Sequence, residues 1–315
     1  MTEWTRLERA VSEALSGHGG ARLVAVDQVV RRSTHPTLVA VVRTGAGTEL
    51  SLFVKHGRST PGQRLPNAPR GGLVREAAVY REILASVDSS APRFHGTYTD
   101  ETGETWLFVE HVEAACRVAE SADETAPART MRWLGRFHAR AEPLLGRARL
   151  LGLPRQGAAS GLEWAERAVD FSRELHGDYP WLDGLRSEVV DLLMPLRDLP
   201  ETVIHFEFVP DNVLHAGHRV VPVDWESAAI GPGVLDLAFF TDDWAGAALE
   251  DDYIAARWAG GPAPAGFPDA LAAARLFMNL RWLGDDPEMT VHPGARWRFG
   301  ALEAAWAACR RVHSR

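Results

Sequence analysis

The stretch that decides the fold is Val203 to Asp224, VIHFEFVPDNVLHAGHRVVPVD, in which polar residues lie between short apolar runs. Two of those runs, 213–214 and 220–223, are separated by the turn sequence AGHR. Short apolar runs bounded by turn residues are typical of buried strands joined as a hairpin. We therefore expect 205–212 to be a loop that leaves one strand, and Asp224 to stand where the hairpin ends.

Four side chains in this stretch can bind protons or metal ions: His205, Glu207, Asn212 and Asp224. Two carboxylates and an amide oxygen make an oxygen-rich site. Mg²⁺ prefers such ligands, usually together with the phosphates of a substrate. The simpler alternative is an acidic loop without this role in an ordinary α/β domain.

The same residues resemble a known family. The pattern H-x-[D/E]-x-x-x-x-N, then a hairpin, then DWESAAIGPGVLDLA, resembles the catalytic segment of the aminoglycoside phosphotransferase / choline kinase-like family, whose members share the protein-kinase fold. The resemblance implies that Glu207 is the catalytic base and that Asn212 and Asp224 hold Mg²⁺. It also implies that His205 belongs to the catalytic loop, which it would brace rather than serve in acid–base chemistry, and that Asp236 supports that loop.

Two residues depart from the family pattern, which most often has Gly in place of Phe206 and Asp in place of Glu207. Glutamate is one methylene longer than aspartate, so its carboxylate stands about an ångström further out. A misplacement on that scale can cost roughly 100-fold in rate. Either the site is rebuilt around Glu207, or the transfer is slow, altered or absent.

Lys55 is the only lysine in the chain, because the other 33 of the 34 basic residues are arginines. Lysine and arginine are not interchangeable where a compact charge must fit beside phosphates. Lys55 stands late in a predicted strand, and Glu76 lies on the predicted amphipathic helix that follows. The resemblance implies that Lys55 contacts the α- and β-phosphates and pairs with Glu76. The alternatives are a lysine that survived by chance and a glutamate on a solvated helix face.

Two further segments are expected to contact the nucleotide. The resemblance implies a covering loop between the first two predicted strands, where Ser33 and Thr34 would contact phosphate although the loop has no glycine. It implies a hinge between two lobes after the strand at 105–110. Backbone groups from Glu110 to Val112 would receive the adenine there.

The fold is predicted to be α+β, with the two-lobe arrangement of the protein-kinase-like fold. Residues 1–110 would form a small lobe with an antiparallel sheet, and residues 111–315 a mainly helical lobe with the catalytic loop, metal site and acceptor-binding region. The periodicity of apolar residues predicts strands at 22–30, 37–43, 49–56, 92–98 and 105–110, and helices at 3–16, 73–84, 126–141, 162–175, 182–196, 234–244, 249–258, 269–283 and 295–312.

Composition narrows the class of partner. The 315 residues contain 46% hydrophobic residues, enough for a full core, and the net charge of −8 gives no general basic field for nucleic acid or an anionic membrane. Cys116 and Cys309 provide no disulfide framework or metal spacing, which favours the reducing cytoplasm. The N-terminal stretch is typical of a charged amphipathic helix rather than a signal peptide, and no run reaches the roughly 18 apolar residues of a membrane span.

The acceptor is less determined than the donor. Acidic residues are frequent after residue 241 and would attract a cationic acceptor, although surface helices are often acidic without such a role. The tryptophans at 244, 258, 282, 297 and 306 would suit a cation-binding cage, or more simply a helical core.

These features together predict an ATP-dependent, Mg²⁺-requiring phosphotransferase that acts on a hydroxyl of a small molecule, such as an antibiotic or another secondary metabolite. GTP is the alternative donor. A Ser/Thr hydroxyl of a peptide undergoing tailoring is the alternative acceptor. The competing class is a nucleotide-binding pseudokinase, favoured by Phe206, Glu207 and the glycine-free covering loop.

Overall fold

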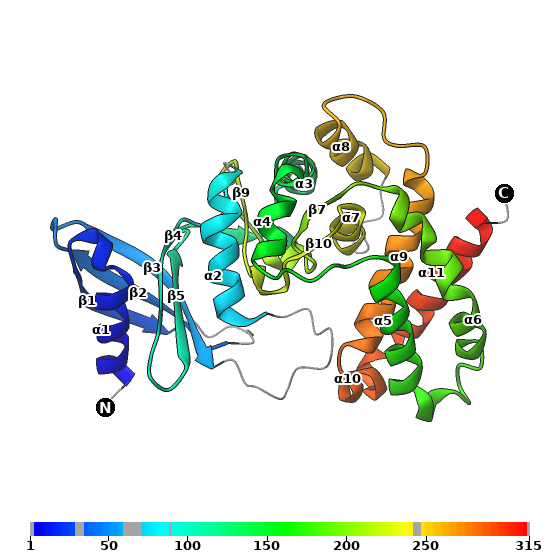
Figure 1. The fold of residues 1–315 in the computed structure, drawn as a ribbon, viewed down its shortest axis with the longest axis horizontal. Helices are drawn as coiled ribbons and strands as arrows, with labels where there is room; N and C mark the ends of the chain where they lie inside the picture. Colours follow the sequence, from blue (N-terminus) through cyan, green and yellow to red (C-terminus); the bar gives the residue numbers. More distant parts are fainter. Residues whose placement is uncertain (1–2, 29–34, 59–70, 88–89, 242–246, 314–315) are drawn as a thin grey trace. The chain divides into compact units, whose positions relative to one another are not determined.

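The structure, a computed structural model, describes residues 3–28, 35–58, 71–87, 90–241 and 247–313 (Figure 1). The chain forms two compact units. So far as they are described, unit 1 comprises 1–66, 70–122 and 211–227, and unit 2 comprises 123–210 and 228–315. Unit 1 thus includes a segment from later in the chain, and the boundary expected at residue 110 stays a prediction.

Unit 1 is built on an antiparallel five-stranded sheet in the order β1-β2-β3-β5-β4. Its strands are β1 (Ala21–Gln28), β2 (Thr37–Thr44), β3 (Glu49–Arg58), β4 (Phe94–Thr99) and β5 (Glu104–Glu110). Alternate residues of β2, namely Leu38, Ala40 and Val42, are buried. This alternation is typical of a strand with one face on a core.

Helix α1 (Glu3–Ala14) supplies the cover for that face. Its Leu7 and Val11 are buried in one apolar cluster with Val42 and Val54 of the sheet. The helix thereby closes the core of the sheet on the side where the strands bury alternate residues.

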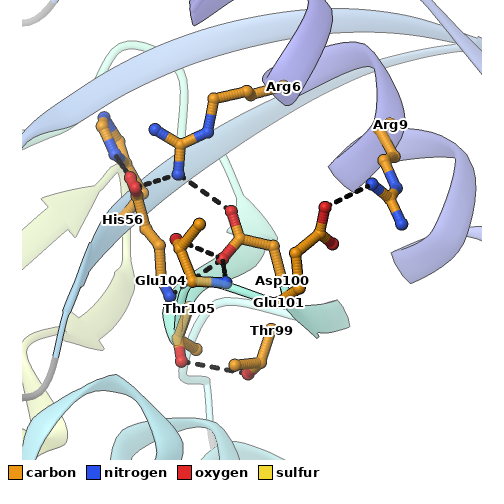
Figure 2. A network of polar contacts seen from close by, with 9 residues as sticks. Arg6, Arg9, His56, Thr99, Asp100, Glu101, Glu104 and Thr105 are labelled. Carbon is orange, nitrogen blue, oxygen red and sulfur yellow. Dashed lines mark hydrogen bonds and ion pairs between the residues drawn. The ribbon is translucent and has the colours of Figure 1, made fainter. Parts of the chain in front are cut away.

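A network of charged groups also ties α1 to the β4–β5 turn (Figure 2). Arg6 donates to Asp100 at 2.8 Å and forms a second ion pair with Glu104. The other Glu104 oxygen lies 2.8 Å from Nδ1 of His56 on β3. The network therefore reaches the strand that carries Lys55, one residue away.

Three further elements complete unit 1. These are helix α2 (Gly72–Glu82), the two-residue strand β6 (Cys116–Arg117), and the hairpin of β8 (Val213–Ala216) with β9 (Arg219–Pro222), where β6 pairs with β8. The predicted hairpin is confirmed, and its turn contains Gly217 at a φ of 59°. Glycine adopts such positive φ values without steric cost.

Unit 2 is mainly helical. Its helices are α3 (Ala126–Ala141), α4 (Leu145–Leu150), α5 (Ala158–Phe171), α6 (Leu182–Leu193), α7 (Val234–Thr241), α8 (Ala247–Arg257), α9 (Phe267–Gly284), α10 (Pro287–Val291) and α11 (Trp297–His313). Helix α9 packs against α5, α7 and α11, and α3 packs against α8. A two-stranded antiparallel sheet joins β7 (Glu201–Ile204) to β10 (Ala229–Pro232). None of the described helices combines the length and apolar character of a membrane span.

The predicted α+β class is confirmed, with two kinds of difference in detail. Helix α5 begins at Ala158, four residues before the predicted start at Leu162, because the hydroxyl of Ser160 accepts the Gly157 N–H at 3.0 Å and supports an earlier first turn. Strands β6 and β10 and helices α4 and α10 were not predicted, since each has six residues or fewer and shows no clear periodicity.

Candidate functional site

A charge cluster of Lys55, Glu76 and Asp224, of which the first two are buried, forms the centre of the site in unit 1. The Nζ of Lys55 donates to both carboxylate oxygens of Glu76 at 3.0 Å and to Oδ1 of Asp224 at 2.7 Å. Lys55 is 7% exposed and Glu76 is 1% exposed. Lys55 and Glu76 thus hold each other in one geometry, away from water.

Each member of this cluster is placed by a different element. Lys55 lies on β3, where it is opposite Thr37 of β2 and Leu107 of β5, so its backbone is fixed from both sides. Glu76 lies on the buried face of α2. Asp224 follows β9 and has a φ of 69°, a left-handed conformation that is rare outside glycine. This backbone turn accompanies the contact between its carboxylate and Lys55.

Helix α2 is bonded directly to the backbone that follows Asp224. The N–H of Trp225 donates to Oε1 of Glu76 at 3.2 Å, and the N–H of Gly71 donates to the carbonyl of Glu226 at 2.8 Å. Glu76 therefore orients both the lysine and the Asp224 segment.

The electrostatics of the cluster follow from burial and charge. Burial alone would lower the pKa of Lys55, but the carboxylates of Glu76 and Asp224 raise it well above its usual value, so the ammonium stays charged. Burial raises the pKa of the Glu76 carboxyl, and the Lys55 ammonium opposes that rise. The site therefore presents one fixed positive charge between two acidic groups.

A cavity of about 380 Å³ opens onto this cluster. Its apolar walls include Val39, Phe53, Leu107, Val109 and Leu214, and its polar lining includes Lys55, Glu76, Glu110, Asn212 and Asp224. The backbone segment 110–112 also lines it. An apolar chamber with a few convergent polar groups is the usual form of a small-molecule site.

The structure thus brings together six of the predicted nucleotide and metal residues around one cavity: Lys55, Glu76, Glu110, Val112, Asn212 and Asp224. Ser33 and Thr34 lie outside the described residues. Their expected contact with phosphate stays a prediction.

The predicted hinge segment leaves one backbone position available. The N–H of Glu110 donates to the carbonyl of Arg93 at 2.8 Å, and that of His111 donates to the carbonyl of Ser51 at 3.1 Å. Within the described part of the chain, the backbone of Val112 makes no hydrogen bond. Val112 also lines the cavity, so its backbone is a candidate contact for a ligand there.

The oxygen donors of Asn212 and Asp224 suit a hard divalent cation. Both residues line the cavity, and the Asp224 side chain is 28% exposed. Among the described residues there is no cluster of three or more His, Cys, Asp or Glu side chains suited to a metal. Mg²⁺ does not require one, because it usually binds through one or two protein ligands together with substrate phosphates and water.

The Glu110 carboxylate does not point freely into the cavity. It accepts from the Nη2 of Arg219 at 2.8 Å, is also paired with Nη1, and accepts from the backbone N–H of Arg93 at 3.0 Å. The hydrogen bonds from Arg219 lower the pKa of Glu110 to about 2. The end of β5 is thereby fastened to β9.

In unit 2, Asp236 organises the loop that contains His205 and Glu207. Its fully buried carboxylate accepts the backbone N–H groups of His205 and Phe206, each at 2.7 Å. The Nε2 of His138 lies 3.2 Å from the same carboxylate. The ring of His205 stays within the loop, where its Nδ1 accepts the N–H of Glu207 at 3.3 Å.

The structure adds a residue that the sequence did not single out. Arg281 of α9, fully buried, forms an ion pair with the carboxylate of Glu207. The sequence held one signal for it, since Arg281 is the one charged residue of the mainly apolar run LFMNLRWL. A charged residue on a buried helix face needs a partner, but nothing in the sequence named which.

The tryptophans of unit 2 have separate partners. Trp258 contacts Tyr253 and Phe267, and Trp282 contacts Phe239. Trp306 instead stacks on Trp181. For these three tryptophans the contacts favour the core role over a shared cation-binding cage, whereas Trp297 is 63% exposed and Trp244 lies outside the described residues.

Comparison with known proteins shows which family the chain matches and which solved structures resemble it. A family model described as the phosphotransferase enzyme family matches residues 28–277. No curated protein matches the chain. Three solved structures illustrate the likeness, and they confirm the protein-kinase-like fold.

The first structure is choline kinase LicA from Streptococcus pneumoniae, with 15% identity, a TM-score of 0.58, and coverage of 92% of this chain and 94% of that chain. The second is the GDP complex of aminoglycoside 2'-phosphotransferase-IIIa, with 12% identity, a TM-score of 0.63, and coverage of 97% and 99%. The third is macrolide 2'-phosphotransferase MphH from Brachybacterium faecium, with 18% identity, a TM-score of 0.53, and coverage of 98% and 97%.

Proposed function

Because the chain belongs to the phosphotransferase enzyme family, we propose that it transfers the γ-phosphoryl group of ATP to a hydroxyl of a small molecule, such as an antibiotic or another secondary metabolite. The observation that carries this proposal is the contact of Lys55 with both Glu76 and Asp224 at the wall of one cavity. A charged lysine held between two carboxylates suits the binding of phosphates beside a metal ion.

The residues of unit 1 take the donor nucleotide in this proposal. Lys55, oriented by Glu76, contacts the α- and β-phosphates, and the apolar walls of the cavity receive the base. The backbone of Val112 contacts the base. Asn212 and Asp224 would hold Mg²⁺, which when bound neutralises charge on the phosphates.

The residues of unit 2 serve the acceptor. Glu207 orients the acceptor hydroxyl and takes its proton as the hydroxyl oxygen bonds to the γ-phosphorus and the bond to the nucleoside diphosphate breaks. His205 and Asp236 hold the backbone of the loop. Because the transition state for phosphoryl transfer is loose in most analyses, these groups act mainly by position.

The choice of donor and acceptor is part of the proposal. ATP is the proposed donor and GTP the alternative, since one similar structure is a GDP complex. Similar structures are named for choline, aminoglycoside and macrolide acceptors, which supports a small-molecule hydroxyl. A peptide hydroxyl and a nucleotide-binding protein without efficient transfer are the competing functions.

The test compares the wild type with Asp224→Ala. Mg²⁺ with ATP or GTP should raise the melting temperature of the wild type, since a ligand at one hundred times its dissociation constant stabilises by about 2.7 kcal/mol. Release of nucleoside diphosphate is then measured with kanamycin, a macrolide and choline as acceptors. Asp224→Ala should lose both responses, whereas Asp191→Ala, which removes an exposed acid of α6, should keep them.

Full turnover in Asp224→Ala would reject the proposed site. Stabilisation by nucleotide without turnover on any acceptor, hydroxyl-bearing peptides included, would instead favour a nucleotide-binding protein.

A further inference from the structure

The two residues that depart from the family pattern, Phe206 and Glu207, meet at one side chain. Glu207 forms an ion pair with the guanidinium of Arg281, and the ring of Phe206 lies 5.0 Å from the same guanidinium. The two departures and Arg281 are therefore parts of one arrangement.

Arg281 is enclosed by aromatic faces. Its guanidinium lies 5.4 Å from the ring of Phe239 and 5.1 Å from that of Trp282, in addition to the contact with Phe206. Arg281 is 0% exposed, and its Nε and Nη1 make no hydrogen bond with any described residue. Nη2 is the nitrogen that bonds to Glu207.

In this setting Arg281 depends on its ion pair with Glu207. A buried cation is costly without a partner, and ring faces compensate for only part of the lost hydration. The Glu207 carboxylate, 6% exposed, is the group that balances the charge of Arg281. The direction of the Glu207 side chain is consequently fixed by Arg281.

The backbone of Phe206 is strained, and the packing of its ring offsets that strain. Phe206 has a φ of 67°, in the left-handed region where glycine is favoured and a residue with a side chain is strained. Its buried ring contacts the rings of Phe239 and Phe277 edge-on. These contacts and the covering of Arg281 offset the cost of the strained backbone.

We propose that Arg281 is a positioning residue for phosphoryl transfer, which holds the Glu207 carboxylate where the acceptor hydroxyl is oriented. This proposal rests on the proposed function. It assigns a reason to the longer side chain: at this position glutamate reaches the guanidinium, whereas an aspartate on the same backbone falls about one methylene short. The site is built around Glu207 rather than impaired by it.

The experiment is a double-mutant cycle of Glu207→Asp and Arg281→Met, read as nucleoside diphosphate release from Mg·ATP with kanamycin, choline or water as acceptor. Each single variant should lower kcat at least tenfold or so, because misplacement of about an ångström costs on that scale. The double variant should be no more than about threefold slower than the slower single variant, since the length of residue 207 matters only while Arg281 is present. The KM for ATP should change less than about twofold in all three, because Lys55 and Asp224 are untouched.

Arg298→Met is the matched control. Arg298 lies 5.1 Å from the ring of Trp282, as Arg281 does, and donates to the carbonyl of Trp282 rather than to Glu207. Its loss should leave the rate near that of the wild type and should not change the effect of Glu207→Asp. Arg281→Lys keeps a buried cation and should recover part of the rate, which also provides a reading if Arg281→Met does not fold.

Three outcomes overturn the inference. One is Glu207→Asp as fast as or faster than the wild type. The second is single-variant effects that multiply in the double variant. The third is Arg281→Lys as slow as Arg281→Met. If the wild type itself neither binds nor turns over Mg·ATP or Mg·GTP, the proposed function fails first. If the wild type is active but the effects of the two single variants multiply, only the positioning role of Arg281 is rejected and the proposed function stands.

Discussion

The backbone N–H of Trp225 donates to the same Glu76 carboxylate that holds Lys55, at 3.2 Å. One buried side chain of α2 thereby controls both the lysine of β3 and the segment that begins at Asp224. A change at Glu76 should accordingly affect two partners at once.

Glu76→Gln keeps the shape of the side chain and removes its charge. We expect turnover to fall between about 10-fold and 100-fold, because Lys55 would be left with Asp224 alone and both would shift from their positions. Steady-state kinetics with Mg·ATP should show a higher KM for the nucleotide together with the lower kcat. Glu82→Gln, at the exposed end of the same helix, is the control and should behave as the wild type.

Lys55→Met should reduce stability as well as activity. Removing the cation leaves the carboxylates of Glu76 and Asp224 close together, with Glu76 fully buried. Breaking a buried ion pair from one side costs about 3 kcal/mol. Urea unfolding measures this loss, and the nucleotide-dependent rise in melting temperature should disappear. An unchanged unfolding midpoint would show that the carboxylates do not depend on Lys55.

The pair of Glu110 and Arg219 predicts a pH dependence of stability. Arg219 lowers the folded-state pKa of Glu110 from 4.5 to about 2. The folded protein therefore favours the ionised carboxylate more than the unfolded chain does. A lowered pKa contributes stability above the unfolded value, and this contribution is lost as the pH falls from about 4.5 toward 2. The difference in unfolding free energy between the wild type and Glu110→Gln, on the order of 1 kcal/mol at pH 6 for so exposed a pair, should shrink at pH 3.

The exposed pair of Arg43 and Glu49 gives the comparison. Glu49→Gln should differ little from the wild type at either pH, since ion pairs in water contribute little. A pH-independent effect of Glu110→Gln would mean that the ion pair with Arg219 is not formed in solution.

The charged network beside α1 predicts a contrast between two arginines (Figure 2). The side chain of Arg6 is 27% exposed and bonds to both Asp100 and Glu104, whereas that of Arg9 is 48% exposed and forms its ion pair with Glu101. Arg6→Met should lower the unfolding free energy by about 1 kcal/mol, and Arg9→Met should lower it by clearly less, because an ion pair exposed to water contributes little. Differential scanning calorimetry resolves the two, and equal effects would contradict the network as drawn.

The resemblance to a known family predicted the residues around Lys55, because the motif residues that carry it lie in a fixed order on regular elements. Lys55, Glu76, Asn212 and Asp224 each stand at a position where periodicity or a turn can be recognised, and the structure brings them to one cavity. Their chemistry is visible in their types alone: one cation, two acids and an amide. That the cavity takes a nucleotide remains a proposal.

The partners of Glu207 and Glu110 could not be predicted in the same way. Arg281 lies 74 residues from Glu207, and Arg219 lies 109 residues from Glu110. Such pairs depend on helix packing and strand placement, which no local pattern encodes. Among 33 arginines, residue type alone could not identify these two.

The burial of Lys55 has a practical consequence for studying the protein. Acylating reagents attack a neutral amine, and the amine of Lys55 is covered, protonated and held by two carboxylates in the folded chain. No other lysine competes with it. The rate at which this single side chain is acylated therefore measures how often unit 1 opens around Lys55, and a mass increment on one tryptic peptide would report it without any engineered probe.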